Sequence, residues 1–424
     1  MKTAENFRPL SPQGGLGRKG AVVTALGRPR SLAGATVLQL VSALRDDDAG
    51  NAAVDITMTL LQSGARAIVA GDGGPLVGEI RALGGEWLPM SATSFNPLTI
   101  KRNARRISEL IAGERIDIVH AQSASAAWSA LTATHKQPVF TVTSFPDALP
   151  GYSRLSYLPG KWFGGSLARG NRVIAPSSYV SLAMIERYGI APSRITVIPR
   201  SIDTSAFSPA AMTVERIAAL RRAWGLLPRI RVVLVPGRIA PENGQMSVID
   251  AARLLIANGD RNIAFVFTGD DRGEPHYRAQ LRKRAAMHGI DTLCRFTGRS
   301  ADLPAALAAA DVVVVPALAP PISGRSIAEA QAMGRPVVTT AVGVLPEHVL
   351  CPPRMREELR TGWVVRPGHA GEIARGIAAA LQLDPTAYEA LGARARQYAD
   401  FMFSPRSVAE AIRGVYTSLL AREA

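Results

Sequence analysis

Short apolar runs of strand length alternate with longer segments of helical periodicity along most of this chain. The first run covers residues 36–41, and it is rich in β-branched side chains, as strands usually are. Further runs in the first half lie at residues 67–70, 116–119, 139–142, 172–175 and 195–198. An alternation of strands and helices predicts a parallel sheet with helices on both faces.

The alternation lapses between Pro199 and Pro228, which makes this segment a candidate linker, and then resumes. The second half predicts strands at 232–235, 264–268, 295–297, 312–315 and 337–340, with helices near 245–257, 276–288, 301–309 and 323–333. After Gly371 the pattern is helical almost to the end. The predicted fold class is therefore α/β, with two tandem Rossmann-like, doubly wound domains facing a cleft and with ligands at the carboxyl ends of the strands.

The length of 424 residues favours two domains of about 200 residues over a single core. Residues 1–34 carry six basic side chains against the single acid Glu5, and they are predicted to be a disordered basic tail. We predict an N-terminal domain at 35–205 and a C-terminal domain at 206–404. A last helix at 405–424 is predicted to pack back on the linker.

A net charge of +15 favours anionic partners. Nucleic acid is not expected among them, because the chain lacks long Lys/Arg runs and zinc-finger spacing and only 6% of its residues are aromatic. No apolar stretch approaches the ~18 to 20 residues of a membrane span. The short apolar run at 21–27 leads directly into Arg28 and does not resemble a signal peptide. Two cysteines without metal spacing suggest a cytoplasmic protein.

The most informative stretch runs from Ser323 to Pro336. Small residues and Gly324 open a helix, and Gly334 followed by Pro336 closes it. Glu329 lies in the middle of this helix among alanines, where an ionised carboxylate needs hydrogen-bond donors. Two interpretations are open: the carboxylate binds a vicinal diol such as a ribose, or it forms a surface pair with Arg325 one turn earlier.

A second candidate site is the turn from Pro236 to Gln245, which joins a predicted strand to a predicted helix. Gly237 allows backbone N–H groups to approach a phosphate, and Arg238 offers a guanidinium that grips one with two hydrogen bonds. An ordinary loop with a solvated arginine is the alternative. The chain has no Walker lysine and no G-x-G-x-x-G here, which argues against an ATPase or a dinucleotide site.

Candidate chemistry in the first half is sparser. His120 ends an apolar strand and is followed by Ser123, so its imidazole is expected to point into the cleft; a purely structural histidine is equally compatible with the pattern. The acidic clusters at 46–48 and 270–271 are interpreted as solvated turns, and no metal site is expected.

Basic residues recur at helical spacing at Lys101, Arg102, Arg105 and Arg106. This basic amphipathic helix suits either an anionic membrane surface or a solvated face over an ordinary core stripe.

With these motifs, the chain resembles the group 1 (family 4) glycosyltransferases of the GT-B type over roughly residues 36–420. The second half resembles the donor-site signature of that family through Gly237-Arg238, Gly244-Gln245, the run 310–316 and the stretch from Gly324 through Glu329 to Pro336. The first half is similar through 120–123, 127–130 and 198–203. The resemblance implies two Rossmann-like domains, a nucleotide-diphosphate sugar on the second and an acceptor on the first.

Carried over residue by residue, the resemblance implies that Arg238 contacts the donor diphosphate, that Glu329 contacts the ribose hydroxyls, and that the backbone of Ser323, Gly324 and Arg325 contacts phosphate or sugar. Gly237 and Asn243 complete the donor-binding residues that the resemblance implies, and Arg238 and Glu329 are expected to act in catalysis as well. On the acceptor side, it implies roles for Gly50, His120 and Ser123. The family usually transfers with retention and without a bound metal, so no cofactor is expected.

This sequence departs from the family pattern at several positions. The diphosphate lysine of the family falls at Asn243, and the first glutamate of its paired-glutamate motif falls at Pro321. A histidine often found after the fourth strand meets residues 143–145, and the glycine-rich acceptor loop is reduced to residues 49–51. The donor site has thereby lost one positive charge and one carboxylate.

The resemblance predicts a glycosyltransferase that moves a sugar from a nucleotide diphosphate onto a lipid-linked or cell-envelope saccharide at the inner membrane face. The main alternative is a non-catalytic relative that binds a sugar nucleotide or a partner without transfer. A nucleotide-sugar epimerase on the same two-domain plan is a third hypothesis.

Overall fold

The computed structural model describes residues 31–45, 47–91, 94–135, 137–145, 165–260, 262–271, 273–321 and 323–421. Most of the predicted basic tail therefore lies outside the described residues. The end of that segment departs from the prediction of disorder, because the Leu32 side chain is buried in the first core and the Gly34 amide donates to the Gly64 carbonyl over 2.9 Å.

The first domain is built on a parallel sheet of seven strands in the order β3-β2-β1-β4-β5-β6-β7. Its strands are β1 Thr36–Ala43, β2 Arg66–Asp72, β3 Glu86–Pro89, β4 Ile118–Ala121, β5 Phe140–Ser144, β6 Arg172–Ala175 and β7 Ile195–Val197. Its helices are α1 Asp48–Gln62, α2 Val77–Leu83, α3 Pro97–Glu114, α4 Ala124–Thr134 and α6 Ser178–Tyr188. The strand order reverses between β1 and β4, because the chain moves outward to β3 on one side of β1 and returns to β4 on the other. Such a reversal leaves a crevice at the carboxyl ends of β1 and β4.

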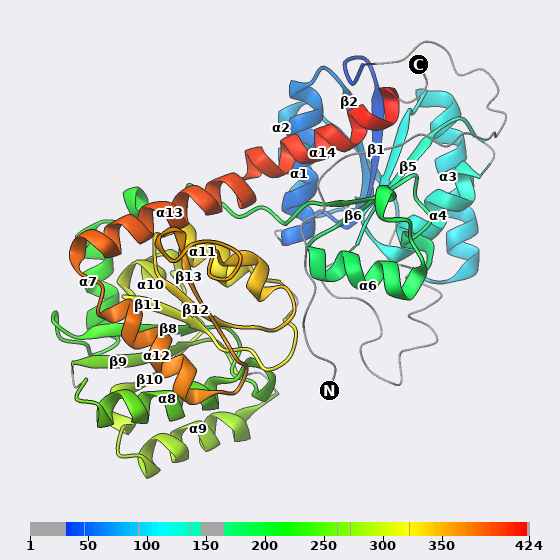
Figure 1. Ribbon diagram of the computed structural model, residues 1–424. Coiled ribbons are helices and arrows are strands. Elements are labelled where there is room, and N and C mark those ends of the chain that lie inside the picture. The colour runs from blue at the N-terminus through cyan, green and yellow to red at the C-terminus, as the bar shows by residue number, and fades with distance from the viewer. Residues whose placement is uncertain are drawn as a thin grey trace.

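The second domain repeats the plan with six parallel strands in the order β10-β9-β8-β11-β12-β13. Its strands are β8 Arg231–Pro236, β9 Ile263–Thr268, β10 Cys294–Gly298, β11 Val312–Val315, β12 Val337–Thr340 and β13 Gly362–Val365. Its helices are α7 Val214–Ala223, α8 Gln245–Ala257, α9 Pro275–Met287, α10 Leu303–Ala309, α11 Arg325–Ala332 and α12 Ala370–Leu381. The predicted α/β class with two Rossmann-like domains is confirmed (Figure 1).

Each sheet is covered on both faces, and the strands show why. In β8, Val232 and Leu234 point into one core while Val233 and Val235 point into the other. Because alternate side chains of a strand face opposite sides, a strand buried on both sides must be apolar throughout. This explains the unbroken apolar runs that the sequence shows.

Two edge strands, β3 and β13, were not predicted. In β3 two of the four residues are exposed, and in β13 three of the four are only half-buried. An edge strand has a neighbour on one side only, so it needs no continuous apolar run and leaves a weak signal in the sequence.

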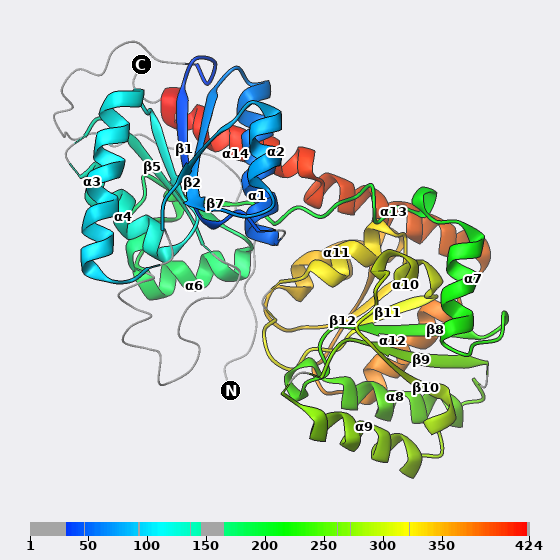
Figure 2. The ribbon, with the colours of Figure 1, turned by 180° about the vertical axis from the view of Figure 1, so that it is seen from behind.

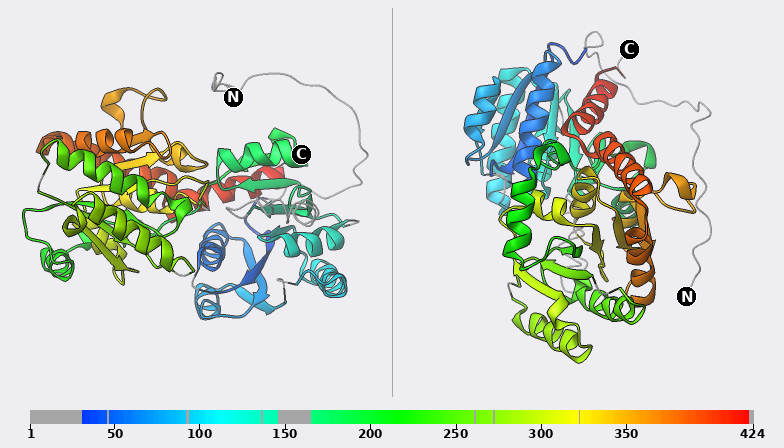
Figure 3. Two further views of the ribbon diagram at one scale, coloured as in Figure 1. Left: turned by 90° about the horizontal axis from the view of Figure 1, so that it is seen from below. Right: turned by 90° about the vertical axis from the view of Figure 1, so that its left-hand side faces the viewer.

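The last two helices, α13 (Pro385–Phe403) and α14 (Pro405–Leu420), connect the domains, as Figures 1 and 2 show. Helix α13 packs on α11 of the second domain, and α14 packs on α1 of the first. Val408, Ile412 and Tyr416 of α14 belong to the same buried cluster as β1 and β4 of the first sheet. The final helix therefore goes beyond the linker and completes the core of the first domain, and the further views in Figure 3 show it there as well.

Candidate functional site

The turn after β8 is closed by its own side chains. Gly237 has a φ of +118°, and its N–H donates to the Thr268 carbonyl over 2.9 Å. The side-chain amides of Asn243 and Gln245 both donate to the Arg238 carbonyl over 2.8 Å. Gly237 therefore occupies a left-handed conformation that favours glycine, and Asn243 holds the turn in shape.

The Arg238 guanidinium points out of this turn and is 48% exposed. It forms an ion pair with Glu242, four residues further along the chain. An incoming phosphate would meet an arginine that is accessible but already paired, so Glu242 would have to yield at least one of the guanidinium donors.

Helix α11 carries the second group of predicted donor residues. Ser323 and Gly324 precede its first residue, Arg325, and Gly334 closes it with a φ of +70°. The Glu329 side chain is 3% exposed, and its Oε1 accepts a hydrogen bond from Arg325 Nε over 2.6 Å. The Arg325–Glu329 pair therefore forms, but the carboxylate is buried in the domain and does not lie on its surface.

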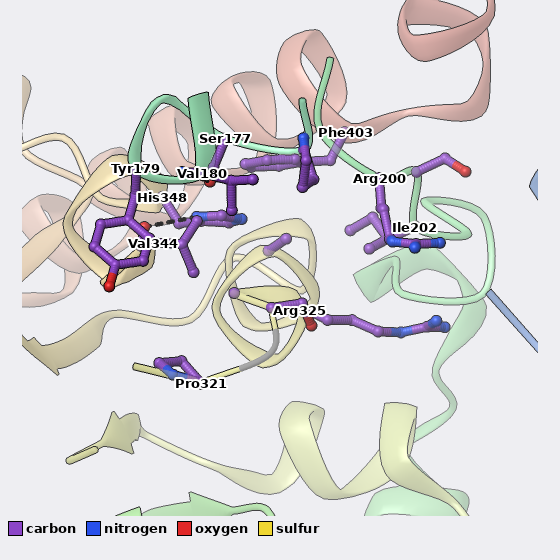
Figure 4. Close-up of a pocket in the computed structure, with 15 residues that line it drawn as sticks. Ser177, Tyr179, Val180, Arg200, Ile202, Pro321, Arg325, Val344, His348 and Phe403 are labelled. Atoms are coloured by element: carbon purple, nitrogen blue, oxygen red, sulfur yellow. Dashed lines mark hydrogen bonds between the residues drawn. The ribbon is translucent and has the colours of Figure 1, made fainter. Parts of the chain in front are cut away.

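Ser323, Gly324 and Arg325 line a narrow pocket of about 30 Å³ between the two domains (Figure 4). A Cβ atom on Gly324 would lie 2.6 Å from the His348 ring, so only glycine lets α11 begin at this point. Facing residues of the first domain include Tyr179 and Val180 of α6. The start of α11 thus lies at the contact between the domains.

A larger cavity of about 450 Å³ opens where the strands of the first sheet end. Its wall is formed by α1, by the ends of β5, β6 and β7, by the linker and by the start of α14. The charged side chains that line it are Asp55, Glu79, Arg200, Asp203 and Arg325. Arg200 and Arg325 line the narrow pocket as well, so the two cavities are adjacent.

The carboxylates of this cavity differ in their environments. Burial raises the pKa of Asp55, and repulsion from Glu79 and Asp203 adds to the rise, while a 3.0 Å hydrogen bond from the Ser201 hydroxyl opposes it. A hydrogen bond from Ser205, and then backbone donors, lower the pKa of Asp203. Asp55 therefore lies in a negative field and would be stabilised by hydrogen-bond donors of a ligand.

The prediction that His120 points into the cleft is wrong. Its side chain is fully buried, Nδ1 lies 2.7 Å from the Tyr416 hydroxyl, and Nε2 lies 2.7 Å from the Ser144 hydroxyl. Burial lowers the pKa of His120 to about 3, so the ring is neutral at pH 7. The structural interpretation of this histidine is therefore the one that the geometry favours.

Gly50 and Ser123 also have local structural roles. A Cβ atom on Gly50 would lie 1.9 Å from the Arg45 carbonyl oxygen, so α1 can start only with glycine there. Ser123 caps α4 by accepting from the Ala126 N–H over 3.3 Å. Their neighbours Ala49, Asn51 and Gln122 line the larger cavity.

Two carboxylates that line the larger cavity, Asp55 and Glu79, were not predicted as site residues. The only signal was a carboxylate next to an apolar residue on each of two helices that follow strands of the first sheet. Within the described ranges, no group of three or more His, Cys, Asp or Glu side chains is arranged to hold a metal ion. Among the helices of the described residues, none is both long and apolar enough to cross a bilayer.

Both halves of the sequence match known family profiles. Residues 230–383 match "Glycosyl transferases group 1", and residues 50–206 match "Glycosyltransferase Family 4". A relative from Salinispora arenicola named D-inositol 3-phosphate glycosyltransferase is 35% identical over 188 residues, which is 42% of this chain and 41% of that protein. One of the same name from Geodermatophilus obscurus is 30% identical over 263 residues, covering 59% of this chain and 53% of the relative. The chain thus spans about half the length of these curated relatives.

Solved structures resemble the whole fold. A glycosyltransferase from Rickettsia africae superposes with a TM-score of 0.75 at 24% identity, covering 92% of this chain and 99% of that one. The HepE protein of Anabaena in complex with UDP gives a TM-score of 0.70 at 20% identity, covering 91% and 100%. WaaG, a glycosyltransferase involved in lipopolysaccharide biosynthesis, superposes with a TM-score of 0.57 at 16% identity, covering 91% of this chain and 100% of that one. At these identities the likeness concerns the fold alone.

Proposed function

We propose that this protein, which belongs to the group 1, family 4 glycosyltransferases of GT-B fold, transfers a sugar from a nucleotide diphosphate to a saccharide hydroxyl. The observation that carries the proposal is the adjacency of two sites. The start of α11, with Arg325, borders the cavity at the edge of the first sheet. A donor on the second domain would thereby meet an acceptor on the first.

The donor half of the proposal rests on groups that attract a diphosphate. Arg238 is half-exposed at the end of β8, and the N-terminus of α11 adds backbone N–H groups and a partial positive charge. Glu329 would accept hydrogen bonds from the ribose hydroxyls. These positive groups neutralise the leaving diphosphate, so we propose that no divalent metal is required.

The transfer itself exchanges one bond at the sugar. The acceptor hydroxyl oxygen bonds to the anomeric carbon while the bond from that carbon to the β-phosphate oxygen breaks. The hydroxyl proton passes to the leaving diphosphate, and the sugar keeps its anomeric configuration. Arg238 and Arg325 would stabilise the charge that develops on the phosphate oxygens, where preorganised donors are most effective.

The acceptor half rests on the chemistry of the 450 Å³ cavity. Asp55, Glu79 and Gln122 offer oxygen acceptors to hydroxyl groups, and Ile56 and Val408 offer apolar contact. This mixture of oxygen acceptors and apolar surface suits a saccharide, whose hydroxyl groups donate hydrogen bonds. We therefore propose a lipid-linked or cell-envelope saccharide as the acceptor class.

A membrane surface is the proposed setting. Phe95 and Leu98 are 48% and 78% exposed at the start of α3. Lys101, Arg102 and Arg105, which follow within two turns, are exposed as well. Apolar side chains beside basic ones allow a helix to rest on anionic lipid, which supports a peripheral position at the inner membrane face.

The non-catalytic alternative is favoured by two observations. Asn243, which replaces the family lysine, is used to close the turn, and Arg238 is paired with Glu242. In that case a sugar nucleotide or a protein partner would bind without transfer. Replacing Asn243 by lysine would then restore a charge that catalysis needs.

Donor binding is tested by titration calorimetry with UDP, GDP and their sugars, with and without EDTA; the HepE complex makes UDP the first ligand to try. We expect binding that is insensitive to EDTA and weakened by about 1.5 to 3 kcal/mol in Arg238→Ala, the range for hydrogen bonds to charged groups. Arg253→Ala, at an exposed position of α8, is the matched control. Binding that requires metal, or equal loss in both variants, would contradict the donor site.

A further inference from the structure

Glu347 of the second domain contacts the start of α6 in the first domain. Its Oε2 accepts from the Ser178 N–H over 2.7 Å, and its Oε1 accepts from the Tyr179 N–H over 2.6 Å. Glu347 lies in a short 3-10 helix, Leu345–His348, that follows β12, whereas α6 follows β6. The contact therefore joins the carboxyl edges of the two sheets.

These two N–H groups are the ones that α6 cannot satisfy itself. The first N–H groups of an α-helix have no carbonyl partner within the helix. In α6 the Ser177 hydroxyl accepts from Val180, and the Ser177 carbonyl accepts from Ser181. The N–H groups of Ser178 and Tyr179 have no acceptor within the helix, and both donate to the Glu347 carboxylate. The negative carboxylate thereby lies at the positive end of the helix dipole.

The turn that carries Glu347 is held firmly by its own domain. The Tyr398 hydroxyl donates to the Glu347 carbonyl over 2.8 Å, and Arg354 donates to the Pro346 carbonyl over 3.0 Å. The next residue, His348, stacks on Phe403 with the ring centroids 4.8 Å apart. Because this turn is held in place, the Glu347 carboxylate also fixes the position of the α6 N-terminus that it binds.

The contact lies beside the proposed reaction site. The narrow pocket that includes Tyr179 and Val180 also includes Arg325 and His348. In Figure 4, Val344 and His348 lie next to Tyr179 and Val180, and Arg325 extends toward the side where Arg200 lies. The contact between Glu347 and α6 therefore borders the pocket in which α11 begins.

We propose that Glu347 is a positioning residue, which ties the first domain to the second at α6 and so fixes the angle at which the acceptor cavity meets the donor edge. The catalytic consequence rests on the proposed function. Because misplacing reactants by about 1 Å lowers a rate by roughly 100-fold, loosening this tie should lower kcat more than it raises the donor KM.

One of the two backbone donors to Glu347, the Ser178 N–H, can be removed by substitution with proline. Ser178 is the first residue of α6, where proline is tolerated and lacks only the N–H that Glu347 accepts. The preceding residue, Ser177, has φ −161° and ψ 163°, an extended conformation that is allowed before proline. Ser178 is exposed, so a proline ring would meet no core atoms.

Amide hydrogen exchange, followed by NMR, measures the contact without any substrate. In Glu347→Ala we expect exchange at Tyr179 and Ser178 to accelerate by about tenfold or more, while Val180, capped by Ser177, keeps its rate. Glu347→Gln keeps one acceptor oxygen and should be intermediate. Glu358→Ala, at an exposed glutamate of the same domain, should leave all of these rates unchanged. Unchanged exchange in Glu347→Ala would overturn the contact.

Small-angle scattering of the unliganded chain then measures the relation between the domains. We expect Glu347→Ala and Ser178→Pro each to increase the radius of gyration. The double variant should show little more increase than Glu347→Ala alone, because both substitutions remove the same contact. Fully additive increases, or none, would overturn the positioning role.

Kinetics with the best donor complete the test. We expect kcat of Glu347→Ala to fall by roughly 10- to 100-fold with the donor KM nearly unchanged, and Glu347→Gln to recover part of the loss. An unchanged kcat in a variant with an altered radius would refute the positioning role. If the unaltered protein transfers no sugar at all, the proposed function fails, and exchange and scattering alone decide the interdomain tie.

Discussion

Acidification from pH 7 to pH 5 should destabilise this protein through two buried, neutral histidines. Burial lowers the pKa of His120 to about 3 and that of His348 to about 4. The unfolded chain has histidines near pKa 6.5, so below that pH it binds protons that the native state does not accept. The contribution of these two histidines to the free energy of unfolding is thus fully present above about pH 6.5. It is lost as the pH falls toward their folded-state pKa values.

The size of the effect follows from the pKa difference. Each histidine contributes a slope approaching 1.36 kcal/mol per pH unit, which integrates to about 2 kcal/mol between pH 7 and pH 5. Since both native pKa values lie below pH 5, the two histidines stay largely neutral in the folded protein over this range. His120 lies in the first domain and His348 in the second, so each domain should melt about 4 to 8 °C lower at pH 5.

Scanning calorimetry at half-unit steps between pH 7 and pH 5 measures the slope. His120→Asn and His348→Asn should each remove about 1.36 kcal/mol per pH unit from it, whatever they do to the stability at pH 7. His276→Asn, at an exposed histidine, should leave the slope intact. A melting temperature that is flat from pH 7 to pH 5, or an unaltered slope in His120→Asn, would refute this reasoning.

Three further outcomes are expected. Glu329→Gln should weaken nucleotide binding by about 1.5 to 3 kcal/mol in calorimetry, since a buried carboxylate loses its charge, whereas the exposed Glu389→Gln should not; equal affinity in both would retire the ribose role. Tyr416→Phe should lower the free energy of unfolding by about 1 to 3 kcal/mol in denaturant titration, because it leaves the buried Nδ1 of His120 without a partner. An unchanged free energy of unfolding would contradict the docking of α14. In co-sedimentation, Lys101→Ala with Arg105→Ala should reduce binding to anionic vesicles by about 1 kcal/mol per removed charge, and binding to neutral vesicles of equal strength would argue against the membrane role.

The second domain could be predicted well because its signals are local. The helix predicted at 245–257 is α8 over the same residues, and Gly334 ends α11 as its position indicated. Buried parallel strands need continuous apolar runs, and glycines with positive φ mark turns, so both features are written in neighbouring residues.

The first-domain site could not be predicted in the same way because its partners are distant in sequence. His120 lies 296 residues before Tyr416, the group that occupies its Nδ1. A strand that ends in histidine does not show whether the ring faces the cleft or the core. The cavity around Asp55 likewise exists only once α1, the linker and α14 have come together.

The most direct test of the central claim is the release of nucleoside diphosphate from a panel of sugar nucleotides, with membrane extract as acceptor and with sugar incorporation measured in parallel. We expect at least one donor to yield diphosphate and bound sugar in equal amounts without added metal, and Arg238→Ala to abolish both. If the unaltered protein is silent with every donor while Asn243→Lys with Pro321→Glu turns over, the native chain is a binding-only relative and the transferase account is contradicted.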